Sequence, residues 1–275
     1  MPSIVDGSSP IGIFDSGIGG LTVVREILLN LAGESLIYLG DTARVPYGTK
    51  SSRTVVRYSL SNAGFLVPKG IKLLVAACNT ASAFAIPALR NECGLPVVGV
   101  IEPGAKKAAS ATKTGRVGVI GTSSTIKSGA YKKAVHEIDP EITVYSTPCP
   151  LFVPLADEGL NNNDIARLAA QRYLAPLKGS GVDVLILGCT HYPLLKSIIQ
   201  EAIGEKVLLV DSAQETAAEI KGVLEKNDLA NNGSAKPTTE FYLTDVSDTF
   251  VEVAERFLGR EIEHIEQVDI GNNYG

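Results

Sequence analysis

The chain has 275 residues, 45% of them hydrophobic and 20% charged, and its formal net charge is −5. A chain of this size can bury a sizeable core in one large or two medium domains. Its acidic and basic residues are interspersed, which argues against a nucleic-acid surface, and no apolar run is long enough to span a bilayer.

The first ten residues lack the basic start and apolar stretch of a signal peptide, so we expect a cytoplasmic protein with no membrane partner. The cysteines show no CxxC and no short spacing, which is not typical of a disulfide framework or of a zinc site. They are expected to be free thiols at positions 78, 93, 149 and 189.

Short β-rich runs alternate with helical stretches, a pattern that predicts an α/β fold with parallel sheets covered by helices. The expected strands are 11–14, 36–39, 73–76, 97–100, 117–120 and 184–187. The expected helices are 23–31, 51–66, 82–90, 164–174 and 213–224, followed by a surface loop at 226–237 and helical periodicity at 247–258.

Two pairs of segments repeat at nearly one offset. KLLVAACNTASA at 72–83 resembles DVLILGCTHYPL at 183–194, and GIFDSG at 12–17 resembles GVIGTS at 118–123. Buried strands often look alike, but two signals at offsets of about 106 and 111 indicate a duplicated α/β unit. Two such domains facing each other would bring Cys78 and Cys189 to one cleft.

Several polar residues follow the expected strands, where open parallel sheets bind ligands. Asp15 and Ser16 come before a glycine-containing turn, which could meet an anion or be a plain strand-to-helix turn. Asp41 follows the next strand and precedes VPYG at 45–48, in which Tyr47 could contact a ligand or simply pack.

The cysteine motifs are CNTAS at 78–82 and GCTHYP at 188–193. In each, a thiol ends a strand at the start of a helical segment, where the helix N-terminus favours a thiolate. A lone cysteine is often a small core residue and a lone histidine is often structural, so His191 and each thiol also have a packing interpretation. Cys93 and Cys149 carry no comparable context and are assigned to packing or loops.

Two thiols on opposite sides of a carbon atom suit the inversion of a stereocentre beside a carboxylate. One group removes the α-proton and the conjugate acid of the other returns a proton on the opposite face. A cysteine pKa of about 8.5 is readily tuned for both tasks. Without a cofactor or a metal, the carbanion must be stabilised by electrostatics alone.

Five blocks in order resemble the cofactor-independent aspartate/glutamate racemase family, and within it glutamate racemases. They are GIFDSGIGGLTV at 12–23, YLGDTARVPYG at 38–48, VAACNTASA at 75–83, GVIGTSSTI at 118–126 and LGCTHYPLL at 187–195. The resemblance implies interconversion of L- and D-glutamate for bacterial peptidoglycan, and hence for cell wall biogenesis and cell shape. It also implies a cytoplasmic enzyme without cofactor or metal that forms a homodimer.

The resemblance further implies roles for individual residues. The catalytic set is Cys78, Cys189, Asp15, Glu158 and His191, with Glu158 supported only by the short block ADEGL at 156–160. The substrate-binding set is Asp15, Ser16, Tyr47, Gly48, Asn79, Thr80, Thr122, Thr125, Thr190 and His191.

The family fold implies two similar α/β domains with the site between them. We expect residues 1–100 and 211–275 in the first domain and 101–210 in the second. Alternatives remain: a racemase or isomerase for aspartate or maleate, a hydrolase with a thiol nucleophile and His191 as base, or a binding protein that closes on an amino acid.

Overall fold

The computed structural model describes residues 5–271, except for the side chains at positions 248 and 249. Its strands are β1 (Ile11–Asp15), β2 (Leu36–Gly40), β3 (Leu73–Ala76), β4 (Val97–Gly99), β5 (Arg116–Gly121), β6 (Thr143–Pro148), β7 (Val184–Gly188), β8 (Leu208–Asp211), β9 (Thr239–Leu243) and β10 (Glu266–Gln267). The longer helices are α1 (Leu21–Asn30), α2 (Ser52–Leu66), α3 (Asn79–Glu92), α4 (Ile101–Ala111), α6 (Ala130–Ile138), α8 (Asp164–Gly179), α9 (Lys196–Ile203), α10 (Ser212–Lys226) and α11 (Asp248–Leu258), and the shorter ones are α5 (Ser123–Ser128) and α7 (Phe152–Asp157).

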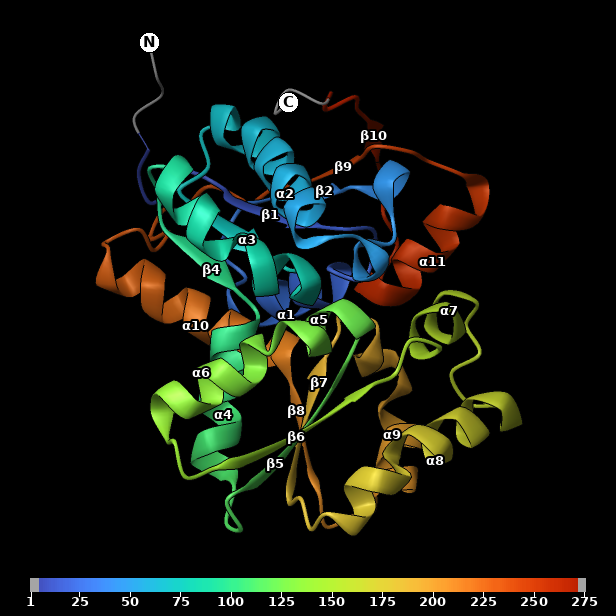
Figure 1. Ribbon diagram of the computed structural model, residues 1–275. Coiled ribbons are helices and arrows are strands. Elements are labelled where there is room, and N and C mark those ends of the chain that lie inside the picture. Colours follow the sequence, from blue (N-terminus) through green and yellow to red (C-terminus); the bar gives the residue numbers. More distant parts are fainter. Residues whose placement is uncertain (1–4, 272–275) are drawn as a thin grey trace.

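The strands form two parallel sheets that lie one above the other in Figure 1. The upper sheet has the order β10-β9-β2-β1-β3-β4 and the lower has the order β6-β5-β7-β8. The series β2-β1-β3-β4 therefore repeats as β6-β5-β7-β8, which confirms the predicted α/β class with two similar units. The same correspondence pairs β1 with β5 and β3 with β7, as the two repeated sequence segments predicted.

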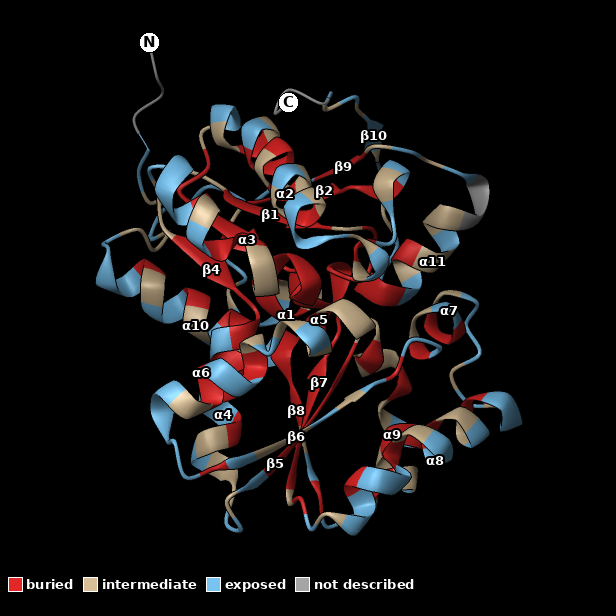
Figure 2. Cartoon of the chain, viewed as in Figure 1, coloured by how far each residue is buried: buried red, intermediate tan, exposed pale blue. Residues whose placement is uncertain are grey.

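Helices cover both faces of the sheets, so the central strands are buried throughout (Figure 2). β1, β2, β3 and β7 contain no exposed residue, which explains why they read as continuous hydrophobic runs. β6 lies at a sheet edge and is largely exposed or half-buried, so its sequence carries no such run. This strand was not predicted.

Two helices connect the sheets. α4 follows β4 and leads to the lower sheet, and α10 follows β8 and leads back to β9, which pairs with β2. α4 and α10 pack together, with Lys106 and Glu219 forming an ion pair at 2.9 Å. The domain boundaries stay a prediction, and positions 1–4 and 272–275 of the expected first domain lie outside the described residues.

The predicted element bounds need two corrections at strand ends. Val100 was expected in a strand, but its backbone is already helical, with φ −92° and ψ −6°, and it caps α4. α3 begins at Asn79 rather than near residue 82, so Cys78 is its N-cap. Both cases arise because strands here end directly on helices with almost no intervening loop.

None of the helices in the described range combines the length and the apolar character needed to cross a membrane.

Candidate active site

The carboxyl ends of the central strands place the predicted residues side by side. Phe14 of β1 is aligned with Ala76 of β3, so Ser16 and Cys78 follow at the same level, with their Oγ and Sγ atoms 3.4 Å apart. In the lower sheet, Gly121 is aligned with Gly188, so Thr122 and Cys189 follow together. Each thiol thus leaves the corresponding strand of its own sheet.

Both thiols line one cavity of about 680 Å³. Its wall also contains other residues of the predicted site, namely Ser16, Tyr47, Gly48, Asn79, Thr80, Thr122, Glu158, Thr190 and His191. Residues that sequence reasoning did not single out complete the wall, including Ile18, Val45, Val153, Asp157, Phe250 and Val253. The prediction that the two cysteines share a cleft is therefore confirmed by the tertiary structure.

Two predicted residues lie behind the cavity wall. Thr125 is buried and forms a triangle of hydroxyl groups with Thr80 and Thr122, with oxygen–oxygen distances of 3.0 to 3.1 Å. Since Thr80 belongs to α3 and the other two to the start of α5, the triangle joins the two halves of the molecule. Asp15 is fully buried, and its Oδ2 accepts a hydrogen bond from the Gly17 amide at 2.9 Å.

Burial controls the ionisation of Asp15 and Cys78. Burial raises the pKa of Asp15, although His191 and nearby backbone amides oppose this. Burial, aided by the charge of Asp15, raises the pKa of Cys78 to about 12, and the hydrogen bond with Ser16 only partly counteracts it. Burial thus favours the thiol form of Cys78 over the expected thiolate, because desolvation outweighs the helix N-terminus.

His191 lies between Cys189 and a carboxylate. Its Nδ1 is 3.7 Å from the Cys189 sulfur, and its Nε2 is 3.2 Å from Asp157 Oδ1. Burial opposes its charge, but interactions with Asp157 and Cys189 outweigh burial and raise the pKa of His191 well above its usual value. These interactions favour the charged imidazolium form of His191.

The carboxylate paired with His191 is that of Asp157, the neighbour in the chain of the predicted site residue Glu158. Asp157 ends α7 and is half-buried, whereas Glu158 is exposed at the rim of the same cavity. Successive residues at a helix end point about 100° apart, so only one of two adjacent acids can face the histidine. The block ADEGL contains both residues and could not distinguish them.

The other side of His191 packs against α11. The Phe257 ring meets the imidazole edge to face, with ring centroids 5.1 Å apart. Arg256 donates a hydrogen bond from Nη1 to the Asp157 carbonyl oxygen at 3.3 Å. Figure 1 shows α11 beside α7, so the returning C-terminal segment supports the histidine although it is remote in sequence.

Gly19 allows the turn between β1 and α1 to lie directly against the loop that contains Thr190 and His191. A Cβ atom at this position would be 2.3 Å from Thr190 Oγ1 and 2.5 Å from the His191 ring. Thr22, in the first turn of α1, donates a hydrogen bond to the Thr190 carbonyl oxygen at 3.2 Å. The sequence left open whether this glycine-containing turn meets an anion or is a plain strand-to-helix turn; in the structure, Gly19 serves close approach between the two halves.

We therefore expect Gly19→Ala to lower the free energy of unfolding by about 1 to 3 kcal/mol, because overpacking forces the His191 loop to move. Chemical denaturation measures this change. Gly222→Ala is the matched control: nothing lies within 4 Å of an added Cβ there, and alanine favours the helix. Equal effects of the two substitutions would contradict the close approach at Gly19.

Comparisons with known proteins agree with this geometry. A family model described as Asp/Glu/Hydantoin racemase matches residues 11–220. A glutamate racemase of Geobacter metallireducens is 56% identical over 260 residues, which cover 94% of this chain and 96% of that protein.

Two solved structures are also similar. A glutamate racemase from Francisella tularensis in complex with D-glutamate has a TM-score of 0.91 and 40% identity, covering 96% of this chain and 98% of that one. A glutamate racemase isoform from Bacillus anthracis has a TM-score of 0.90 and 43% identity, with coverage of 95% and 97%. These similarities extend over both sheets and the cavity between them.

Proposed function

This chain belongs to the Asp/Glu/hydantoin racemase family, and we propose that it interconverts L- and D-glutamate with Cys78 and Cys189 as its two acid/base groups. One observation carries the proposal. Two thiols from corresponding strands of two similar sheets line the same cavity. A ligand held there presents opposite faces of one carbon atom to them.

The surroundings of the two thiols suit the first proton transfers. Cys78 is a protonated thiol, because burial and Asp15 raise its pKa to about 12. Cys189 lies beside His191, whose Nδ1 is 3.7 Å from its sulfur and whose own pKa is raised well above the usual value. The Cys189 thiolate removes the α-proton from one enantiomer of glutamate, and the Cys78 thiol gives its proton to the opposite face.

The reaction inverts the configuration at the α-carbon and leaves the composition of the amino acid unchanged. The α-carbon–hydrogen bond breaks, its electron pair remains on the α-carbon, and a new carbon–hydrogen bond forms from Cys78. Afterwards Cys189 holds the abstracted proton and Cys78 is a thiolate. This state removes the α-proton of the other enantiomer, so the same two groups catalyse both directions.

Hydroxyl, amide and backbone groups around the cavity are proposed to bind the charged ends of glutamate. Asn79 is buried in the cavity wall and donates from Nδ2 to the Tyr131 hydroxyl at 2.8 Å. No described group satisfies its Oδ1 atom, which leaves an acceptor for a substrate ammonium group. Thr80, Thr122 and Thr190 supply hydroxyl groups in the same wall.

The product D-glutamate is proposed to supply bacterial peptidoglycan synthesis. We also propose a cytoplasmic homodimer that needs neither cofactor nor metal, as the family resemblance implies. Gel filtration with light scattering measures the oligomeric state.

The decisive assay follows the circular dichroism of L-glutamate incubated with the protein. The signal should decay to zero, and in D2O the α-hydrogen should exchange with solvent deuterium. L-Aspartate in the same assay tests the alternative substrate. Decay with aspartate but not with glutamate would contradict the proposed substrate, and decay with neither would contradict racemisation.

A further inference from the structure

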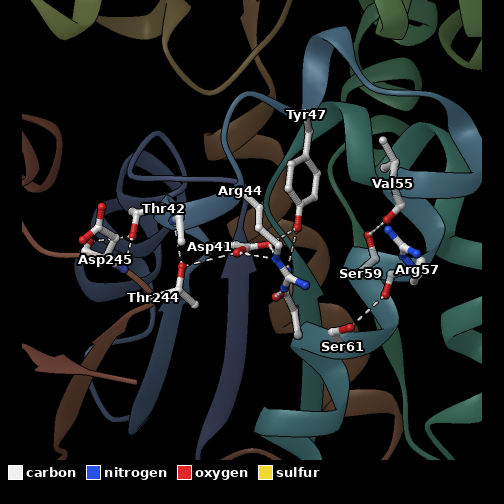
Figure 3. Close-up of polar contacts among 12 residues, drawn as sticks. Asp41, Thr42, Arg44, Tyr47, Val55, Arg57, Ser59, Ser61, Thr244 and Asp245 are labelled. Carbon is white, nitrogen blue, oxygen red and sulfur yellow. Dashed lines mark hydrogen bonds and ion pairs between the residues drawn. The ribbon is translucent and has the colours of Figure 1, made fainter. Parts of the chain in front are cut away.

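The loop at 41–50 connects β2 to α2. Several of its side chains form a buried network of polar contacts. Asp41 is fully buried, and Arg44 Nε donates to both of its carboxylate oxygens at 2.8 Å. The Tyr47 hydroxyl donates a short hydrogen bond to Asp41 Oδ2. Figure 3 shows the phenol of Tyr47 directed toward Asp41 and Arg44.

Two further residues tie this group to neighbouring elements. Asn62 of α2 donates to the Tyr47 oxygen at 3.2 Å and accepts from Arg44 Nη2 at 3.1 Å. Thr244, just after β9, donates to Asp41 Oδ1 at 3.3 Å. We call Asp41, Arg44, Tyr47, Asn62 and Thr244 the Asp41 network. It fixes the loop to the upper sheet and to α2.

The Tyr47 phenol stays protonated in this setting. Burial and the negative charge of Asp41 raise its pKa well above the usual value. It therefore serves as a permanent hydrogen-bond donor to Asp41. Although Tyr47 lies in the cavity wall, its hydroxyl group is hydrogen-bonded to Asp41 and Asn62.

The next residue, Gly48, meets the other half of the molecule. Its carbonyl oxygen accepts a hydrogen bond from Ser124 Oγ at 2.6 Å. A Cβ atom on Gly48 would lie 3.0 Å from the Cβ of Thr122. Thr122 belongs to the hydroxyl triangle with Thr80 and Thr125, and both Gly48 and Thr122 line the cavity.

We propose that Tyr47 is a positioning residue: through the Asp41 network it sets how closely Gly48 approaches Thr122 and Ser124, and thereby the affinity for the substrate. This inference rests on the proposed racemisation of glutamate. It assigns Tyr47 an indirect role, in place of the direct substrate contact that the family resemblance implied. The thiols and His191 lie outside the network, so their chemistry is left unchanged.

The first test is Tyr47→Phe, which removes the hydroxyl and keeps the ring. We expect the KM for glutamate to rise about tenfold with kcat within about twofold, because binding is weakened equally in the ground and transition states. Thr244→Val should produce a smaller increase of the same kind. It also provides a readout if the Tyr47 variant does not fold.

Tyr58→Phe is the matched control, since it also removes one phenol hydroxyl near the network. Tyr58 contributes its ring, which lies 4.3 Å from the Arg44 guanidinium carbon. The phenylalanine ring preserves this contact, so KM and kcat should stay unchanged.

A double-mutant cycle tests whether Tyr47 acts through Gly48. Ser124→Ala removes the hydrogen bond to the Gly48 carbonyl and should raise KM a few-fold. If both changes loosen the same contact, the double variant should raise KM by clearly less than the product of the single effects. A purely structural loss at Tyr47 would multiply with the loss at Ser124 and would overturn the inference.

Calorimetric binding of D-glutamate separates this inference from the proposed function. A parent protein that binds D-glutamate without racemising it contradicts the proposed function, and the binding constants of the variants then test the positioning role. A parent protein that does neither contradicts both. An unchanged KM in Tyr47→Phe, or a lower kcat with unchanged KM, overturns the positioning role alone.

Discussion

Replacing Cys78 or Cys189 with alanine should lower the racemisation of glutamate by at least about 10³-fold in both directions. General acid–base groups contribute about 10² to 10⁴-fold, and each cysteine is the only proposed proton carrier on its face of the substrate. Circular dichroism starting from either enantiomer measures the loss. Full racemisation by Cys78→Ala would contradict the two-base assignment.

Hydrogen exchange in D2O distinguishes the two cysteines. With one thiol left, the α-proton can still be removed and returned on a single face. Each alanine variant should therefore exchange the α-hydrogen of only one enantiomer, and the two variants should show opposite preferences. Cys93→Ala is the control, because Cys93 ends α3 outside the cavity wall and should be fully active.

Replacing His191 with asparagine should lower kcat by about 10²-fold and change KM by less than about threefold. The expected loss lies at the lower end of the range of about 10² to 10⁴-fold for general acid–base groups, because both thiols remain. Asparagine carries no charge, so the positive group 3.7 Å from the Cys189 sulfur disappears. Steady-state kinetics in both directions measures this effect, and a changed KM with normal kcat would instead indicate a binding role.

The pH profile tests how His191 is held in its charged form. A group with a raised pKa is protonated below that pKa, so activity that needs the imidazolium is lost as the pH rises through it. Asp157→Asn removes a main cause of the raised His191 pKa. The alkaline decline of kcat should then begin at lower pH than in the parent.

Glu158→Gln in the same experiment separates the two neighbouring acids. We expect this change to leave the alkaline decline of kcat at the same pH as in the parent. Glu158 is exposed at the rim of the cavity, whereas Asp157 is paired with the His191 imidazole. A shift caused by Glu158→Gln and not by Asp157→Asn would support the original assignment from the ADEGL block.

Much of the fold was predictable because buried parallel strands must be hydrophobic along their whole length. The runs around β1, β2, β3 and β7 therefore stood out, and the repetition of β1 in β5 and of β3 in β7 predicted two similar units. Two of the strands that were missed, β6 and β8, have weaker signals. β6 lies at an edge with mostly polar or half-exposed residues, and β8 is only partly buried.

The predicted site depended on a rule of topology. In parallel sheets, residues that follow neighbouring strands meet at one edge, so Ser16 and Cys78 could be expected together, as could Thr122 and Cys189. Which strands are neighbours is decided by the order of each sheet, in which β1 lies beside β3 and β5 beside β7. The ionisation of Cys78 also depends on tertiary packing, because the expected effect of the helix N-terminus is smaller than the effect of burial beside Asp15.

The two thiols, their place at strand ends and the family of the chain could all be predicted from local sequence patterns. Packing in three dimensions was needed to show that Asp157 meets His191, that the Tyr47 hydroxyl is directed toward Asp41, and that Gly19 permits contact with the loop that contains His191. The physical reason is the same in each case. The geometry of these contacts depends on the direction of each side chain and on how the two halves of the molecule pack.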